Sequence, residues 1–234
     1  MDKIVAIHQP NYIPWLGYFY KMAKCDYFVY LDTVQYPRGQ SFAARNRIKT
    51  PNGATYLTIP VRLPHGHKGK VLYSEIECAD MKWKDKHLKT IELNYKRAPY
   101  FTEIYRLLVT SLEKSERFVD INIGLIEAFA NYLNIKSERI KLSEILSQFG
   151  QKTQLIIDIC KRLKANIYLS GDGGGREYND PELLNAHNIQ LKYTNFKHPV
   201  YPQLWSDFVI NMSIIDLLFN YGPASNEILF KDLK

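Results

Sequence analysis

Side chains that could carry chemistry follow directly on a short apolar run near the start of the chain. The run Ile4 to Ile7 is followed by His8, Gln9 and Pro10. Imidazole is the side chain whose ordinary pKa lies closest to neutrality, so it is well suited to general acid–base work. His8 is therefore our first candidate for a catalytic base. The alternative is a buried histidine whose nitrogens are satisfied within the protein.

Amide and aromatic groups are dense in the loop that follows, between two prolines. Aromatic rings there could stack on a base or a sugar, and amides could bind hydroxyl groups. Alternatively, Asn11 caps a turn and the rings of Trp15 and Tyr18 belong to the core. The candidate binding residues of this segment are Gln9, Asn11, Tyr12, Trp15 and Tyr18.

Two further candidates for catalysis lie elsewhere in the chain. Asp32 ends a second predicted strand, where its carboxylate could orient His8, hold a metal or bind a hydroxyl. It could equally cap a loop, and Gln35, three residues later, is a candidate for binding. His198 is the second candidate base. His65 and His67 have no carboxylate near them in sequence, and we predict no metal site.

Three cations stand on alternate positions in the run Arg45-Asn46-Arg47-Ile48-Lys49. In an extended segment, Arg45, Arg47 and Lys49 share one face. Guanidinium groups match the oxygens of phosphate, so with Asn46 beside them these residues are a candidate diphosphate clamp. A solvated strand edge would explain the same pattern.

A glycine-rich loop, residues 170–176, follows the apolar run Asn166 to Leu169. Three successive glycines permit close approach of the backbone to a ligand. The pattern is neither G-x-G-x-x-G nor a Walker sequence, and a flexible turn is the alternative. Its candidate binding residues are Ser170, Gly171, Asp172, Arg176 and Tyr178.

The periodicity of apolar residues predicts the elements that would position these groups. Strand, helix and strand follow one another twice, which is typical of parallel βαβ units joined by right-handed crossovers. We predict a mostly parallel, open, Rossmann-like α/β sheet formed by residues 1–80 and 135–234, with a helical insertion at 81–134. The predicted strands are Ile4–Ile7, Tyr27–Leu31, Tyr56–Val61, Tyr73–Cys78, Arg139–Leu142, Asn166–Leu169 and Gln190–Tyr193. The predicted helices are Trp15–Lys24, three within Met81–Asn134, Thr153–Leu163, Pro181–His187 and Ser213–Phe219, the last capped by Asn211 or Ser213.

Composition narrows the functional classes. The chain has 234 residues, a net charge of +7 and three widely spaced cysteines, which indicates reduced thiols and a cytoplasmic protein. We expect neither a signal segment nor a membrane span, because no apolar stretch approaches the ~20 residues that a spanning helix needs. The positive charge suits an anionic partner or a solvated surface. No motif for binding nucleic acid is present.

Longer stretches of the sequence resemble the WbqC-like protein family. They are IHQPNYIPWLGYFYKM, DYFVYLDTVQY, ARNRIK, TYLTIPV, GQKTQLIIDICKRL and YLSGDGGGREY, together with the segment from HPVYPQL to DLLFNYG. The family is associated with gene clusters for surface polysaccharide, including O-antigen. The resemblance therefore implies a role in making or modifying an activated sugar.

A more distant resemblance is to nucleotidylyltransferase-like folds. These place an H-x-G-H-type element for binding ATP after the first strand, where this chain has Trp15-Leu16-Gly17-Tyr18. They also have a loop ending in arginine near the last strand, where this chain has Ser170 to Arg176. ATP is thus a candidate cofactor by analogy, although both histidines of the element are missing.

Three functions follow as hypotheses. The first is a transferase or ligase that attaches an acyl or aminoacyl group to the amine of a nucleotide-linked sugar, with His8 as base and Asp32 assisting it. The second is an ATP-dependent ligase that adenylates a carboxylate and then forms an amide. The third is a non-catalytic scaffold for glycosyltransferases, with an apolar patch on the helices of residues 81–134. A homo-oligomer is compatible with each.

Overall fold

The computed structural model describes residues 2–37, 39, 41–64, 70–173, 176, 179–205 and 207–233. Its centre is a five-stranded sheet in the spatial order β7-β2-β1-β8-β9, and every pair of neighbours is parallel. The predicted α/β class and mostly parallel sheet are therefore confirmed. The strands are β1 (Ile4–His8), β2 (Tyr27–Tyr30), β7 (Glu138–Lys141), β8 (Ile167–Ser170) and β9 (Gln190–Tyr193).

The strand order reverses in the middle of the sheet. The chain passes from β1 outward to β2 and β7, and then returns to the other side of β1 for β8 and β9. Neighbours β1 and β8 therefore send their following loops in opposite directions. In open parallel sheets, ligands bind outside the carboxyl ends of the strands at such a reversal.

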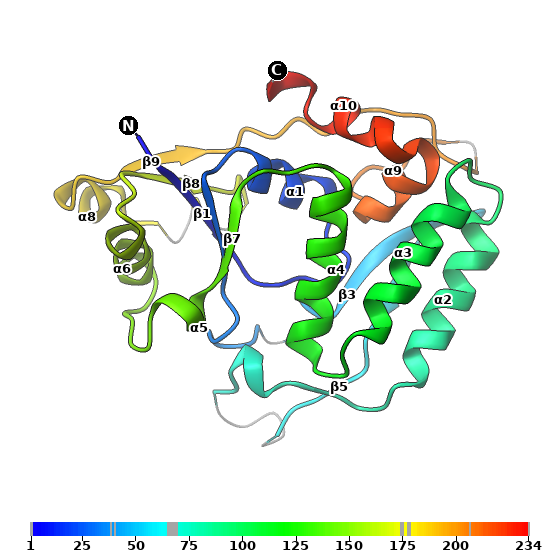
Figure 1. Cartoon of the computed structure of the whole chain (residues 1–234), viewed down its shortest axis with the longest axis horizontal. Coiled ribbons are helices and arrows are strands. Elements are labelled where there is room, and N and C mark those ends of the chain that lie inside the picture. Colours follow the sequence, from blue (N-terminus) through cyan, green and yellow to red (C-terminus); the bar gives the residue numbers. More distant parts are fainter. Residues whose placement is uncertain are drawn as a thin grey trace.

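Helices cover both faces of the sheet, as right-handed crossovers require. Side chains alternate along β1, so Ala6 belongs to one hydrophobic cluster and Val5 and Ile7 belong to the other. On the side of Ala6 lie α1 (Leu16–Ala23) and α4 (Phe118–Tyr132); on the other side lie α6 (Thr153–Leu163) and α8 (Pro181–Ala186). Figure 1 shows α6 and α8 separated by the strands from α1 and α4.

The three predicted helices between Met81 and Asn134 are present as α2 (Lys82–Tyr95), α3 (Phe101–Glu113) and α4. They form one hydrophobic cluster with α1 and with α9 (Ile214–Tyr221), which Ser213 caps through its hydroxyl. The division into a core and an insertion at 81–134 stays a prediction, since α4 also covers the sheet (Figure 1). Further short helices are α5 (Leu142–Ile145), α10 (Ser225–Leu229) and 3-10 turns at Gly222–Ala224 and Lys231–Leu233.

No helix in the described ranges is both long enough and apolar enough to cross a bilayer.

The region after β2 differs most from the sequence prediction. Residues Arg45–Thr50 form β3, which pairs antiparallel with β4 (Gly53–Thr58). The strand predicted at Tyr56–Val61 is divided before Pro60, and β5 (Val61–Arg62) pairs with β6 (Glu77–Cys78) instead. Residues Tyr73–Glu75 form a 3-10 turn rather than the start of a strand.

The indole of Trp15 lies directly over Gly17, at the start of α1. A Cβ on Gly17 would lie 2.4 Å from the Cη2 atom of Trp15. The ring also packs edge-on against Phe196, with centroids 5.4 Å apart, so it cannot move without losing that contact. Overpacking of this kind costs about 1–3 kcal/mol.

We therefore expect Gly17→Ala to lower the free energy of unfolding by about 1–2 kcal/mol in urea titrations, after allowing for alanine's better helix propensity. Gly124→Ala is the matched control, because Gly124 is also helical and its added Cβ would meet nothing within 4 Å. That control should be neutral or stabilising. Equal effects of the two substitutions would contradict the packing argument.

Candidate functional site

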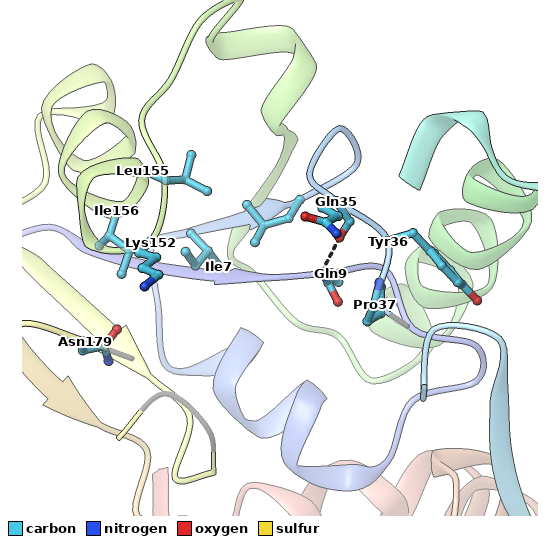
Figure 2. A pocket seen from close by; sticks show the side chains of 10 residues that line it. Ile7, Gln9, Gln35, Tyr36, Pro37, Lys152, Leu155, Ile156 and Asn179 are labelled. Carbon is cyan, nitrogen blue, oxygen red and sulfur yellow. Dashed lines mark hydrogen bonds between the residues drawn. The ribbon is translucent and has the colours of Figure 1, made fainter. Parts of the chain in front are cut away.

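A cavity of about 600 Å³ opens at the carboxyl edge of the sheet, beside the point where the strand order reverses. Its walls come from the ends of β1 and β2, from the first turn of α6 and from the loop after β8 (Figure 2). The lining residues are Ile7, Gln9, Leu31, Gln35, Tyr36, Pro37, Lys152, Leu155, Ile156 and Asn179. The loop after β1 thus reaches the cavity through Gln9, and the chain after β8 reaches it through Asn179, whereas no described residue of the predicted glycine-rich loop 170–176 lines it.

The lining combines an apolar wall with few polar groups. Its polar side chains are the amides of Gln9, Gln35 and Asn179 and the ammonium of Lys152, whereas the hydroxyl of Tyr36 points away from the other lining side chains (Figure 2). None of the lining residues that the structure describes carries a carboxylate, an imidazole or a thiol. These groups suit the binding of a ligand with an apolar body, neutral hydrogen-bonding groups and one anionic group.

Lys152 occupies a backbone conformation that normally requires glycine. Its φ is 53° and its ψ is −126°, and the N–H of Gln154 donates to the carbonyl of Gln151 at 3.1 Å. These are the features of a type II′ turn with Lys152 at the first central position, where glycine dominates. Gly222 has nearly the same angles, φ 51° and ψ −128°. A lysine held there costs about 1–3 kcal/mol, and strain of this kind clusters at functional sites.

The start of α6 adds to the positive potential at this wall. The N–H groups in the first turn of a helix have no partner within the helix, and the helix dipole favours an anion there. The first turn of α6 contains no acidic residue. The N–H of Asp180 donates to Oγ1 of Thr153 at 3.1 Å, which ties the loop carrying Asn179 to the start of the helix.

His8 lies at the end of β1 but points away from the cavity lining. Its side chain shares a face of β1 with that of Ala6, so the imidazole ring lies on the α1 side of the sheet, with its centroid 4.7 Å from that of Tyr18. Its Nδ1 lies 3.0 Å from the carbonyl oxygen of Gln9. Burial, and then the charge of Lys21, lowers the pKa of His8 to about 3. The imidazole is therefore neutral at physiological pH and a weak proton acceptor.

The other two predicted catalytic residues are engaged within the protein. The carboxylate of Asp32 accepts hydrogen bonds from the N–H of Ser143 at 3.1 Å and from its hydroxyl at 2.5 Å, at the start of α5. Nδ1 of His198 donates to the carbonyl of Pro199 at 2.8 Å, and its Nε2 accepts from the N–H of Asn211 at 3.3 Å. Burial also lowers the pKa of His198. Neither residue lines the cavity.

The aromatic candidates of the first loop belong to the core. Tyr12 and Tyr18 are each 1% exposed. The hydroxyl of Tyr12 lies 2.9 Å from Nδ1 of His87, and that of Tyr18 donates to the carbonyl of Gln9 at 3.3 Å. Trp15 packs on Phe196, and Asn11 is buried outside the lining. Of this segment's candidates, only Gln9 lines the cavity.

The residues of the predicted diphosphate clamp on β3 likewise contact other groups of the protein. Arg45 lies over the ring of Tyr56 at 4.3 Å, and Arg47 donates to the carbonyls of Ile210 and Asn211, each at 3.1 Å. The buried Nζ of Lys49 donates to the carbonyl of Asp207. The Asn46 amide donates to the carbonyls of Tyr12 and Ile13 at 3.3 and 2.8 Å. None of the four lines the cavity.

The described residues of the glycine-rich loop do not line the cavity and are held within the protein. The Asn179 amide donates to Oγ of Ser170 at 3.0 Å. The carboxylate of Asp172 accepts from Oγ1 of Thr194 at 2.6 Å and from two backbone N–H groups, and Arg176 lies 3.6 Å from it. Burial alone would raise the pKa of Asp172, but these hydrogen bonds outweigh it and hold the pKa below its usual value.

Two glycine-loop candidates remain. A Cβ added at Gly171 would meet nothing within 4 Å, so packing within the protein does not require glycine there. Tyr178 lies outside the described residues.

Sequence reasoning missed Lys152, Asn179 and Tyr36. A signal for the first existed, because Lys152 directly precedes the predicted helix Thr153–Leu163 and therefore stands at its N-terminus. Asn179 likewise precedes an Asp-Pro helix start at Asp180, whose carboxylate accepts from the N–H of Leu183 at 3.0 Å. No group of three or more His, Cys, Asp or Glu side chains in the described ranges could hold a metal ion.

Comparison with known proteins identifies one family. The WbqC-like protein family matches residues 9–228 of the chain. The chain is also 34% identical over 230 residues, 97% of each protein, to "Uncharacterized protein Rv1507c" of Mycobacterium tuberculosis (strain ATCC 25618 / H37Rv). No solved structure matches it significantly. With the match spanning nearly the whole chain, this protein belongs to the WbqC-like family.

Proposed function

We propose that this protein is an enzyme that binds a nucleotide-linked sugar in the cavity at the carboxyl edge of the sheet. The observation that carries the proposal is the cation Lys152, held in a strained turn at the start of α6 on the wall of a cavity of about 600 Å³. That volume is in the range of pockets for small ligands, roughly 300–1,000 Å³. Lys152 and the α6 terminus would receive the diphosphate.

The rest of the lining fits the remaining parts of such a ligand. Leu31, Leu155 and Ile156 offer an apolar surface for the base. The amides of Gln9 and Asn179 match the hydroxyl groups of ribose or sugar. The ligand would thus lie across the loops after β1 and β8, where nucleotides bind in sheets with this strand order.

The reaction we propose is acyl or aminoacyl transfer to an amine of the sugar, in the biosynthesis of surface polysaccharide such as the O-antigen of lipopolysaccharide. The amine nitrogen would form a bond to the carbonyl carbon, the bond from that carbon to its leaving group would break, and the nitrogen would lose a proton. Family membership supports this assignment. The proton acceptor is not among the described lining residues, because none of them is a base near neutral pH.

Titration calorimetry with UDP, dTDP and ADP, each free and linked to glucose or N-acetylglucosamine, tests the proposal. We expect binding of at least one sugar nucleotide and competition by inorganic pyrophosphate. Pyrophosphate release from ATP in the presence of carboxylic acids would favour the adenylating ligase instead. Absence of heat with every nucleotide would remove the proposal and favour a scaffold.

A further inference from the structure

Several backbone carbonyls at the end of β1 accept hydrogen bonds from side chains, while that of His8 accepts from the backbone N–H of Leu31 at 2.9 Å. The ammonium of Lys21 donates to the carbonyl of Ile7 at 2.9 Å. The carbonyl of Gln9 accepts from Tyr18 at 3.3 Å and faces Nδ1 of His8 at 3.0 Å. The next carbonyl, that of Pro10, accepts from the Asn122 amide at 3.0 Å and from the hydroxyl of Tyr73.

The contact between His8 and Gln9 fixes the tautomer of the imidazole. A backbone carbonyl oxygen can only accept, so Nδ1 of His8 must carry the hydrogen. In the neutral ring the other nitrogen, Nε2, is then without a proton. The groups that face the ring from α1 are the phenol of Tyr18, which packs on it, and the ammonium of Lys21. Burial of the ring, and then the charge of Lys21, disfavours protonation of Nε2.

Alternation along the chain places the neighbours of His8 in the cavity. Ile7 and Gln9 line it, while His8 lies on the opposite side of β1. The Gln9 amide also donates to the carbonyl of Gln35 at 3.3 Å, across the cavity wall (Figure 2). The carbonyl of Gln9 is therefore held by His8 and Tyr18 on the α1 side of the sheet, and the Gln9 side chain lines the cavity on the other side.

We infer that His8 is a positioning residue, which donates from Nδ1 to the Gln9 carbonyl and so holds the Gln9 amide in the nucleotide-sugar cavity, in place of the general base predicted from the sequence. The inference rests on the proposed function for the identity of the ligand. The tautomer of the His8 ring can be measured without any ligand, so this part of the inference is independent of the proposed function.

Three substitutions separate positioning from proton transfer. His8→Asn places an amide N–H where Nδ1 stands, His8→Gln places one near Nε2, and His8→Ala places none. None of the three can act as a base. With UDP-N-acetylglucosamine as probe in calorimetry, His8→Asn should stay within about 2-fold of the wild-type Kd, whereas His8→Ala and His8→Gln should weaken binding about 3- to 10-fold, the worth of one hydrogen bond. Asn behaving like Ala would overturn the inference.

The second measurement is nitrogen-15 NMR of the histidine rings in the full chain without ligand. We expect His8 to show a protonated Nδ1, an unprotonated Nε2 and no titration between pH 5.5 and 8. A neutral ring with its proton on Nε2 and none on Nδ1 would overturn the positioning role even if nucleotides bind. If no nucleotide binds, the proposed function fails, and the ring's tautomer alone decides the role of His8.

Discussion

Lys152→Gly is expected to weaken the binding of UDP or its sugar conjugates about 10- to 100-fold while leaving the protein at least as stable as wild type. A hydrogen bond to a charged group is worth about 1.5–3 kcal/mol, and the substitution removes the one cation among the described lining residues. Glycine is the residue that the turn at φ 53° and ψ −126° favours, so strain is relieved at the same time. Calorimetry and urea unfolding measure the two effects.

The same helix offers a matched control. Lys164 is also exposed, also has a positive φ of 54° and caps the other end of α6. Lys164→Gly removes the same charge and relieves a left-handed conformation, but it lies away from the cavity lining. It should gain stability and keep the wild-type Kd. If both substitutions weaken binding equally, net charge explains the effect; if Lys152→Gly binds UDP as tightly as wild type, the diphosphate lies elsewhere.

The periodic elements were predictable because their patterns are strong and local. The helix predicted at Thr153–Leu163 is observed with those bounds, since its apolar residues recur at helical spacing and its last turn carries Lys161 and Arg162. The strand Ile4–Ile7 extends by one residue to His8. In contrast, β3 was considered only as an alternative, because residues Arg45 to Lys49 are polar at most positions, and its pairing with β4 across Pro51-Asn52 was not predicted.

The location of the cavity was predictable, but the residues within it were less so. A strand followed by His8, Gln9 and Pro10 indicated the edge of the sheet at which the cavity lies. Side chains alternate between the two faces of the sheet, so the face that Ile7 occupies decides which of these residues enters the cavity. Packing of Ile7 against α6 sets that face. In the fold, Tyr18 and Asn46 donate hydrogen bonds to the loop carbonyls of Gln9 and Tyr12. The residue pattern does not indicate this role, because it does not show which carbonyls lack a backbone donor.

The cations of β3 illustrate the same limit. Lys49 was a candidate for binding phosphate, yet it is 1% exposed and lies near Asp216, which is fully buried on α9. Burial raises the pKa of Asp216, and hydrogen bonds and the charge of Lys49 oppose that shift. The carboxylate accepts from Tyr95 at 2.8 Å, Tyr201 at 2.9 Å and Gln203 at 2.8 Å. This polar cluster joins β3, α2, α9 and the segment before α9.

Asp216→Ala is therefore expected to lower the free energy of unfolding by about 3–5 kcal/mol, measured by urea titration. Removal of the Asp216 carboxylate leaves the buried ammonium of Lys49 without the negative charge near it. The phenols of Tyr95 and Tyr201 and the amide of Gln203 also lose the oxygen atoms to which they donate. Asp216→Asn should cost less, about 1–3 kcal/mol, because the amide keeps one acceptor oxygen but not the charge opposite Lys49.

Asp85→Ala provides the control, because Asp85 is an exposed carboxylate in the first turn of α2 and can lose only its interaction with the helix dipole, about 0.3–1 kcal/mol. If Asp216→Ala cost no more than this control, the Asp216 cluster would not stabilise the fold. A large difference between the two substitutions assigns Lys49 to the structure and leaves Lys152 to bind the anion.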